Sequence, residues 1–204
     1  MKLDTLPRFS LAEFPTPIHY LKTLTTHCQG PDIYMKRDDL TSLGMGGNKT
    51  RKLEFLVGQA LADGADTLVT AGGIQSNHCR LTAAAACKAG LACELVLNGT
   101  KPAVPSGNLL LDTIFKARVH YCVREHRDST LDQVAQDIAA RGKKPFVIPV
   151  GGSNGIGSVG YVNAMVELTA QLSAMDLKPA AIIFASSSGG TQAGLALGAI
   201  LTGF

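Results

Sequence analysis

Short apolar runs alternate with segments of helical period along most of the chain, and this alternation is the strongest constraint on its fold. Leucine, valine and alanine recur at helical spacing from Lys49 to Leu61, and Gly64 then ends this helix. Further helices are predicted over residues 77–89, 107–115, 131–141, 159–173 and from 191, and strands over 67–71, 92–97, 119–123, 146–150 and 180–185. Near-continuous apolar strands that alternate with helices form parallel sheets covered on both faces. The sequence therefore predicts an α/β fold.

The first thirty residues lack this regularity. Prolines interrupt short apolar pieces there, which predicts an irregular lead-in that docks on the rest of the protein. A short strand is predicted over residues 33–36, and Arg37, Asp38 and Asp39 follow it. The default interpretation of this charged triplet is a structural ion pair.

Composition limits the classes of function. The chain has 204 residues and 46% hydrophobic content, enough for a real core in one or two domains. The net charge of +3 is not gathered into basic blocks, so we expect no nucleic-acid partner. Five scattered cysteines without a C-x-x-C pair predict reduced thiols, no metal site and a cytoplasmic protein. No apolar run reaches membrane-spanning length, and we expect neither a signal peptide nor a membrane partner.

Three loops that follow predicted strands are glycine-rich and polar, at residues 72–78, 151–155 and 186–191. In open parallel sheets, ligands bind beyond the carboxyl ends of the strands. These loops are therefore the first places to look for a functional site.

A basic helix start follows a pair of glycines in Gly46-Gly47-Asn48-Lys49-Thr50-Arg51-Lys52. Positive charges at a helix N-terminus oppose the helix dipole, so this grouping is unfavourable in itself. Neighbouring like charges would lower the pKa of a lysine, and a neutral amine can form a Schiff base with an aldehyde cofactor. The alternative is a glycine turn with Asn48 as a helix cap and a solvated basic helix start.

The loop over residues 186–191 has the features of a phosphate cradle, namely glycines, hydroxyl groups and the amides of a helix start. Ser76, Asn77 and His78 also lie at a helix start, where they could contact a substrate carboxylate and a cofactor ring. The structural alternative for the 186–191 loop is a plain strand-to-helix turn. Ser76 or Asn77 could instead be a helix cap, and His78 a core or surface histidine. The 186–191 loop does not have the G-x-G-x-x-G pattern of a dehydrogenase, and Ser76 does not stand in the G-x-S-x-G pattern of a hydrolase, so these residues favour neither class.

These motifs occur in the order found in a known family. From Pro15-Thr16-Pro17 through Gly46–Glu54, Gly73–His78 and Pro149–Asn154 to the 186–194 loop, the chain resembles pyridoxal-phosphate enzymes of the tryptophan-synthase β type, and among them the D-cysteine desulfhydrase and 1-aminocyclopropane-1-carboxylate deaminase family. The resemblance implies fold type II, with three-layer parallel sheets in two domains. It divides the chain into the N-terminal part of the large domain (1–50), the small α/β domain (51–150) and a return to the large domain with the phosphate loop (151–204). Relatives continue beyond that loop, so the large domain is expected to be incomplete here.

The resemblance also implies roles for individual residues. Lys49 would hold pyridoxal 5'-phosphate as a Schiff base and Asn77 would bind the ring hydroxyl. Ser76, Asn77 and His78 would face the substrate, with Ser76 binding its carboxylate or acting as a nucleophile. The phosphate would be held by Lys52, Ser188, Gly189, Gly190 and Thr191.

The implied activity is a lyase that converts D-cysteine, a small amino acid, into pyruvate, hydrogen sulfide and ammonia. Ser76-Asn77-His78 is closer to the desulfhydrase pattern than to that of the deaminases, which carry glutamine where His78 stands. 1-Aminocyclopropane-1-carboxylate deaminase is the alternative, and a fragment without activity is an alternative of another class. The resemblance further implies a homodimer for the full-length form.

Overall fold

The computed structural model describes residues 5–204, so the first four residues of the predicted segment 1–50 lie outside the described part. The larger of its two sheets has four parallel strands in the order β5-β4-β3-β6. The strands are β3 (Thr67–Gly73), β4 (Ala92–Asn98), β5 (Arg118–Cys122) and β6 (Pro145–Val147). Gly73 pairs with Asn98 and Asn98 with Cys122, so three carboxyl ends lie in register at one edge. The predicted α/β class is confirmed.

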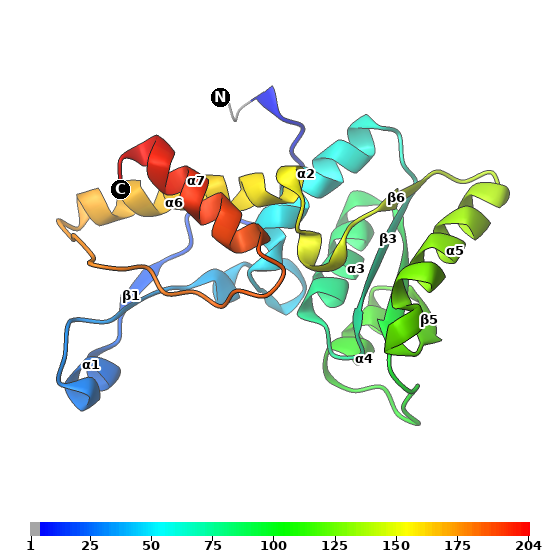
Figure 1. The fold of residues 1–204 in the computed structure, drawn as a ribbon, viewed down its shortest axis with the longest axis horizontal. Coiled ribbons are helices and arrows are strands. Elements are labelled where there is room, and N and C mark those ends of the chain that lie inside the picture. The colour runs from blue at the N-terminus through cyan, green and yellow to red at the C-terminus, as the bar shows by residue number, and fades with distance from the viewer. Residues whose placement is uncertain (1–4) are drawn as a thin grey trace.

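Helices cover both faces of this sheet, as Figure 1 shows with α5 on one side and α3 on the other. Successive strand residues point to opposite faces. Val69, Ala71 and Val96 accordingly pack against Leu131, Val134 and Ile138 of α5 (Arg127–Ala140). Leu68, Leu95 and Leu97 join the larger core formed with α2 (Lys49–Ala62) and α3 (Asn77–Ala89). The sheet is therefore the middle of three layers.

The helices lie close to their predicted positions. The remaining helices of this alternation are α4 (Gly107–Ile114), α6 (Gly155–Ala174) and α7 (Gly190–Thr202). Gly90 ends α3 in the left-handed region at φ 72°, as its position in the sequence predicts. Helices α5 and α6 each begin four residues before the predicted start, because their first turns contain few apolar residues to reveal the period.

The lead-in is more regular than predicted. Strand β1 (Ile18–Tyr20) pairs antiparallel with β2 (Tyr34–Lys36), and α1 (Lys22–Cys28) connects them. Short 3₁₀ turns occupy Asp38–Leu40, Leu43–Met45, Arg124–His126 and Val150–Gly152. The last of these shortens the strand predicted over 146–150.

The strand predicted over residues 180–185 is not formed, and that prediction was wrong. A strand requires a neighbouring chain to complete its hydrogen-bond ladder, and no described residue pairs with this segment. Residues 182–185 instead line a cavity of about 500 Å³ together with β2 and α6. The Ile183 side chain is 96% exposed.

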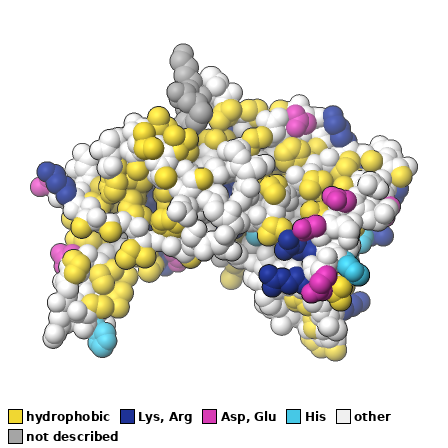
Figure 2. Space-filling model, in the orientation of Figure 1, with side chains coloured by type: hydrophobic (Ala, Val, Ile, Leu, Met, Phe, Trp, Pro, Cys, Tyr) yellow, Lys and Arg dark blue, Asp and Glu magenta, His cyan; other side chains and the backbone are white. Residues whose placement is uncertain are grey.

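Helix α7 packs along α6 and leaves much of its apolar surface uncovered. Its contact side is glycine-rich, because Gly194 and Gly198 lie against Tyr161 and Met165 with no room for a Cβ. Leu197, Ile200 and Leu201 remain exposed, in agreement with the apolar character predicted for this helix. Figure 2 shows hydrophobic side chains gathered over the α6 and α7 part of the molecule and charged ones over the sheet-bearing part. None of the helices described here is long and apolar enough to span a membrane.

Asp112 of α4 is a buried acid between α4 and α3. Its side chain is fully buried, and neither carboxyl oxygen has a hydrogen-bond partner among the described residues. Burial raises the pKa of Asp112 to about 7, although the nearby charge of Arg80 acts in the opposite direction. Folding is therefore linked to proton uptake at this side chain.

Replacing Asp112 with asparagine should stabilise the protein above neutral pH. An unfolded aspartate loses its proton near pH 4, so the free energy of unfolding of the wild type falls as the pH rises from about 4 to about 7. The shift of the Asp112 pKa corresponds to a loss of about 4 kcal/mol in the free energy of unfolding. We expect Asp112→Asn to recover on the order of 2 kcal/mol of this at pH 8, because the buried amide would also lack hydrogen-bond partners. Urea denaturation between pH 4 and 8 measures this effect. Asp132→Asn on the exposed side of α5 is the control, and equal pH profiles for wild type and Asp112→Asn would contradict the assignment.

Candidate active site

Three distant segments meet around one cavity of about 300 Å³. Its lining consists of Asn48, Lys49, Asn77, Thr191 and residues 185–189. In Figure 1 the loop before α7 passes beside the start of α2, which carries Lys49. The structure thus brings the predicted lysine, the predicted asparagine and the predicted serine-rich loop to the same place.

Lys49 is the first residue of α2 and its side chain is half-buried at the cavity. Burial lowers the pKa of Lys49. The sequence predicted such a shift but attributed it to the neighbouring cations, whereas the cause here is loss of contact with water. Arg51 exerts little repulsion, because Asp38 and Glu167 neutralise it. A buried amine with a lowered pKa suits nucleophilic attack on an aldehyde.

The glycine turn before Lys49 is imposed by close packing. Gly46 has φ 74°, and a Cβ at this position would lie 2.0 Å from the Asp39 carbonyl oxygen. Asn48 does not cap α2 with its side chain within the described structure, contrary to the alternative interpretation of the sequence. Its Oδ1 instead accepts a hydrogen bond of 3.1 Å from Asn77 Nδ2. This bond ties the turn to the first residue of α3.

Lys52 lies one helical turn after Lys49 and points towards the serine-rich loop. Its side chain is only 1% exposed, and its Nζ donates to the Gly151 carbonyl at 3.2 Å and to Ser153 Oγ at 3.1 Å. Ser153 Oγ in turn lies 2.6 Å from Ser188 Oγ. Burial, followed by the charge of Lys49, lowers the pKa of Lys52 to about 8. An ammonium group and two hydroxyl groups are therefore concentrated beside the start of α7.

The start of α7 fits a phosphate group. Gly189 stands in the left-handed region at φ 80°, and among the described residues no side chain caps the helix. A Cβ on Gly190 would lie 2.6 Å from Ser153 Oγ and 2.8 Å from Lys52 Nζ, so only glycine leaves this corner open. Free helix amides, hydroxyl groups and a cation together form an anion-binding corner. Sequence reasoning missed Ser153 as a member of this corner and Asn48 as a member of the cavity lining, although the 151–155 loop had been singled out by its position after a strand.

Ser76 and His78 do not line this cavity. Ser76 caps α3 by accepting a hydrogen bond of 3.2 Å from the Cys79 amide. His78 is buried with its Nε2 2.9 Å from Thr70 Oγ1, and burial together with the charges of Lys49 and Lys52 lowers the pKa of His78 to about 3. Its neutral imidazole belongs to the core between β3 and α3. The predicted contacts of both residues with a substrate stay predictions.

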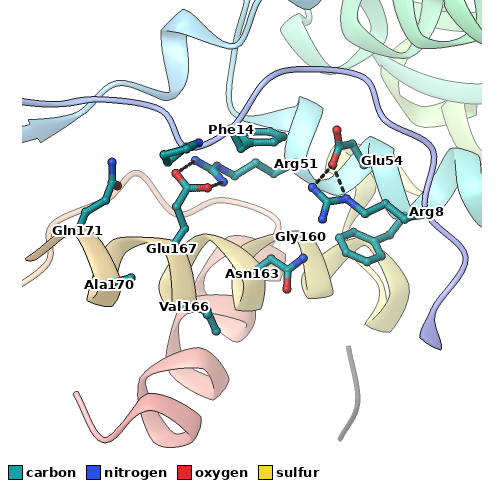
Figure 3. A pocket seen from close by; sticks show the side chains of 12 residues that line it. Arg8, Phe14, Arg51, Glu54, Gly160, Asn163, Val166, Glu167, Ala170 and Gln171 are labelled. Atoms are coloured by element: carbon teal, nitrogen blue, oxygen red, sulfur yellow. Dashed lines mark hydrogen bonds and ion pairs between the residues drawn. The ribbon is translucent and has the colours of Figure 1, made fainter. Parts of the chain in front are cut away.

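A second cavity of about 380 Å³ lies on the other side of α2 and contains a buried ion network (Figure 3). Arg51 donates to Asp38 and to Glu167 at 2.8 to 3.0 Å and lies over the Phe14 ring at 4.4 Å. Lys36 Nζ also binds Glu167. The network connects the lead-in, α2 and α6, whereas Arg37 pairs with Asp39 at the surface as the sequence predicted.

Comparisons with known proteins agree with this arrangement. Residues 9–203 match the family described as pyridoxal-phosphate dependent enzyme. The chain is 46% identical over 202 residues to a D-cysteine desulfhydrase of Klebsiella pneumoniae (strain 342) and 47% identical to one of Salmonella choleraesuis (strain SC-B67). Both alignments cover 96% of this chain and 61% of the relative. A crystal structure described as an ACC deaminase homologue superposes with a TM-score of 0.87 at 41% identity, over 98% of this chain and 61% of that one. The chain thus spans about three fifths of the length of these relatives.

The family match covers nearly the whole described chain, and the fold match confirms the predicted type of fold. The cavity is lined by a half-buried amine and adjoins the anion-binding corner, and an aldehyde phosphate requires both features. The chain belongs to the family of pyridoxal-phosphate dependent enzymes.

Proposed function

We propose that this protein is a pyridoxal-phosphate-dependent lyase that acts on D-cysteine. The reaction takes D-cysteine and water to pyruvate, hydrogen sulfide and ammonia, by loss of the α-proton and of the sulfur from the β-carbon. The observation that carries the proposal is that Lys49, Asn77 and the serine-rich loop line one cavity in a chain 46 to 47% identical to D-cysteine desulfhydrases.

Pyridoxal phosphate supplies an electron-accepting pyridine ring that makes the bonds of the substrate α-carbon easier to break. Lys49 would hold the aldehyde of the cofactor, and its amine, whose pKa is lowered by burial, would be suited to carry the α-proton. Asn77 would orient the ring through its hydroxyl group. Ser188, Gly189, Gly190 and Thr191 hold the phosphate with Lys52, and we add Ser153 to this set because it bonds both Lys52 and Ser188.

We keep Ser76 as the proposed contact for the substrate carboxylate, with Asn77 and His78 beside it. The half-buried Ser76 hydroxyl adjoins Asn77 at the exposed start of α3. His78, being neutral and buried, supports the site by packing rather than by charge. We further propose that the full-length form is a homodimer, and that residues 51–150 form a small domain between two parts of a larger one.

The test is to add pyridoxal phosphate to the purified protein and then supply D-cysteine, L-cysteine or 1-aminocyclopropane-1-carboxylate. We expect equal amounts of pyruvate and sulfide from D-cysteine and much less from L-cysteine. A four-carbon keto acid and ammonia without sulfide would favour the deaminase, which the 41% identity to an ACC deaminase homologue makes the second candidate. Covalent uptake of the cofactor without any product would favour the inactive alternative.

A further inference from the structure

The backbone before Lys49 has an unfavourable conformation. Gly44, Met45, Gly46 and Gly47 all have positive φ angles, at 49°, 73°, 74° and 139°. Such angles are easy for glycine but cost energy at a methionine, and Met45 is also 80% exposed, so its side chain gains little by packing. A turn of this kind keeps its shape only if other parts of the protein hold it.

Two side chains hold this turn by hydrogen bonds to its backbone. Thr41 Oγ1 accepts from the Gly47 amide at 2.8 Å and lies 2.9 Å from the Gly47 carbonyl oxygen. Arg80 of α3 binds the Gly44 carbonyl through Nη1 and the Gly46 carbonyl at 2.9 Å through Nη2. Arg80 is 6% exposed, and the rigid planar guanidinium can satisfy two carbonyl groups at once.

Arg80 also connects the turn to the other half of the cavity. It lies in the first turn of α3, three residues after Asn77, and a Cβ on Gly47 would approach both Arg80 Nη2 at 3.6 Å and Asn77 Nδ2 at 3.9 Å. The hydrogen bond from Asn77 to Asn48 is a second link between the turn and α3. Arg80, which lines neither the cavity nor the anion-binding corner, thus joins the turn before Lys49 to the helix that carries Asn77.

We infer that Arg80 is a positioning residue that, by binding the Gly44 and Gly46 carbonyls, keeps the Lys49 amine half-buried beside Asn77. That the position of the Lys49 amine matters for catalysis rests on the proposed function. The effect of Arg80 on the turn and on the burial of the amine does not depend on it.

The test compares wild type with Arg80→Lys, which keeps the positive charge but cannot span two carbonyl groups. The first measurement is hydrogen exchange at the amides of Gly46 and Gly47, which donate to the Leu43 carbonyl and to Thr41 Oγ1. We expect exchange at least about tenfold faster in the variant, because the turn opens locally. The second is the pH dependence of Lys49 acylation by acetic anhydride, followed by peptide mass spectrometry. In Arg80→Lys, the pKa of the Lys49 amine should rise towards the ordinary lysine value, because water reaches the amine.

The matched control is Val134→Ala in α5, which weakens the core on the other face of the sheet without touching the turn. It should lower the melting temperature while leaving both measurements unchanged. If Arg80→Lys also leaves the hydrogen exchange of Gly46 and Gly47 and the pKa of Lys49 unchanged, the inference is wrong. In the wild type alone, rapid exchange at Gly46 and Gly47 would also overturn it, which keeps the test decisive should the variant fold poorly. Neither measurement uses pyridoxal phosphate, so a negative result here would leave the proposed function standing.

Discussion

Lys49→Ala should abolish covalent attachment of pyridoxal phosphate and reduce pyruvate release from D-cysteine on the order of 10³-fold. The expected loss combines the missing nucleophilic amine with the missing proton carrier, and proton transfer by a positioned side chain alone typically contributes about 10²- to 10⁴-fold. Borohydride reduction followed by peptide mass spectrometry measures the attachment directly. The alanine leaves the cavity open, so weak non-covalent binding of the phosphate should remain.

Lys52 is the informative comparison, because it is a second buried lysine with a lowered pKa, at about 8. Lys52→Ala should keep covalent attachment at Lys49 but weaken affinity for the cofactor, since Lys52 is bonded to Gly151 and Ser153 beside the anion-binding corner. If the reduced cofactor were found on the peptide that contains Lys52, and attached to Lys52, the assignment of Lys49 as the attachment site would be refuted.

Arg51→Met should lower the free energy of unfolding by about 3–5 kcal/mol, the range found when one partner of a buried ion pair is removed. Arg51 is 3% exposed and makes five hydrogen bonds to Thr16, Asp38 and Glu167. Without it, the Asp38 and Glu167 carboxylates lose their shared cation, and Lys36 remains paired with Glu167. Figure 3 shows how the Arg51 side chain reaches from α2 to Glu167 on α6. Urea denaturation at pH 7 provides the measurement.

The matched control is Arg37→Met, which breaks an arginine–aspartate pair of the same 2.7 to 2.8 Å length at the surface. Because that pair is solvated, we expect a change below about 1 kcal/mol. Equal losses in the two variants would mean that burial of the Arg51 network adds nothing to stability.

The regular part of the fold could be predicted because its signals are local. Apolar spacing and the glycines at 64 and 90 gave α2 and α3 their bounds, and the apolar runs gave β3 and β4. The same reasoning failed over residues 180–185, where an equally apolar run forms no strand. Local composition describes what a strand prefers, but pairing depends on a neighbour elsewhere in the fold.

The candidate site divides in the same way. The sequence determined which chemical groups were present, because Lys49, Asn77 and the 186–191 loop carry an amine, an amide and hydroxyl-rich glycines in a recognisable order. It also determined the fold class and the family, since both follow from patterns that can be read along one dimension.

The tertiary structure decided what those groups do to one another. Burial is the cause that lowers the pKa of Lys49, whereas the charge of Arg51 is paired with Asp38 and Glu167, which lie 13 and 116 positions away in the chain. It also gave Asn48 a partner in Asn77, added Ser153 to the anion-binding corner and directed His78 into the core. Desolvation and long-range pairing depend on distances in space, and sequence spacing does not contain them.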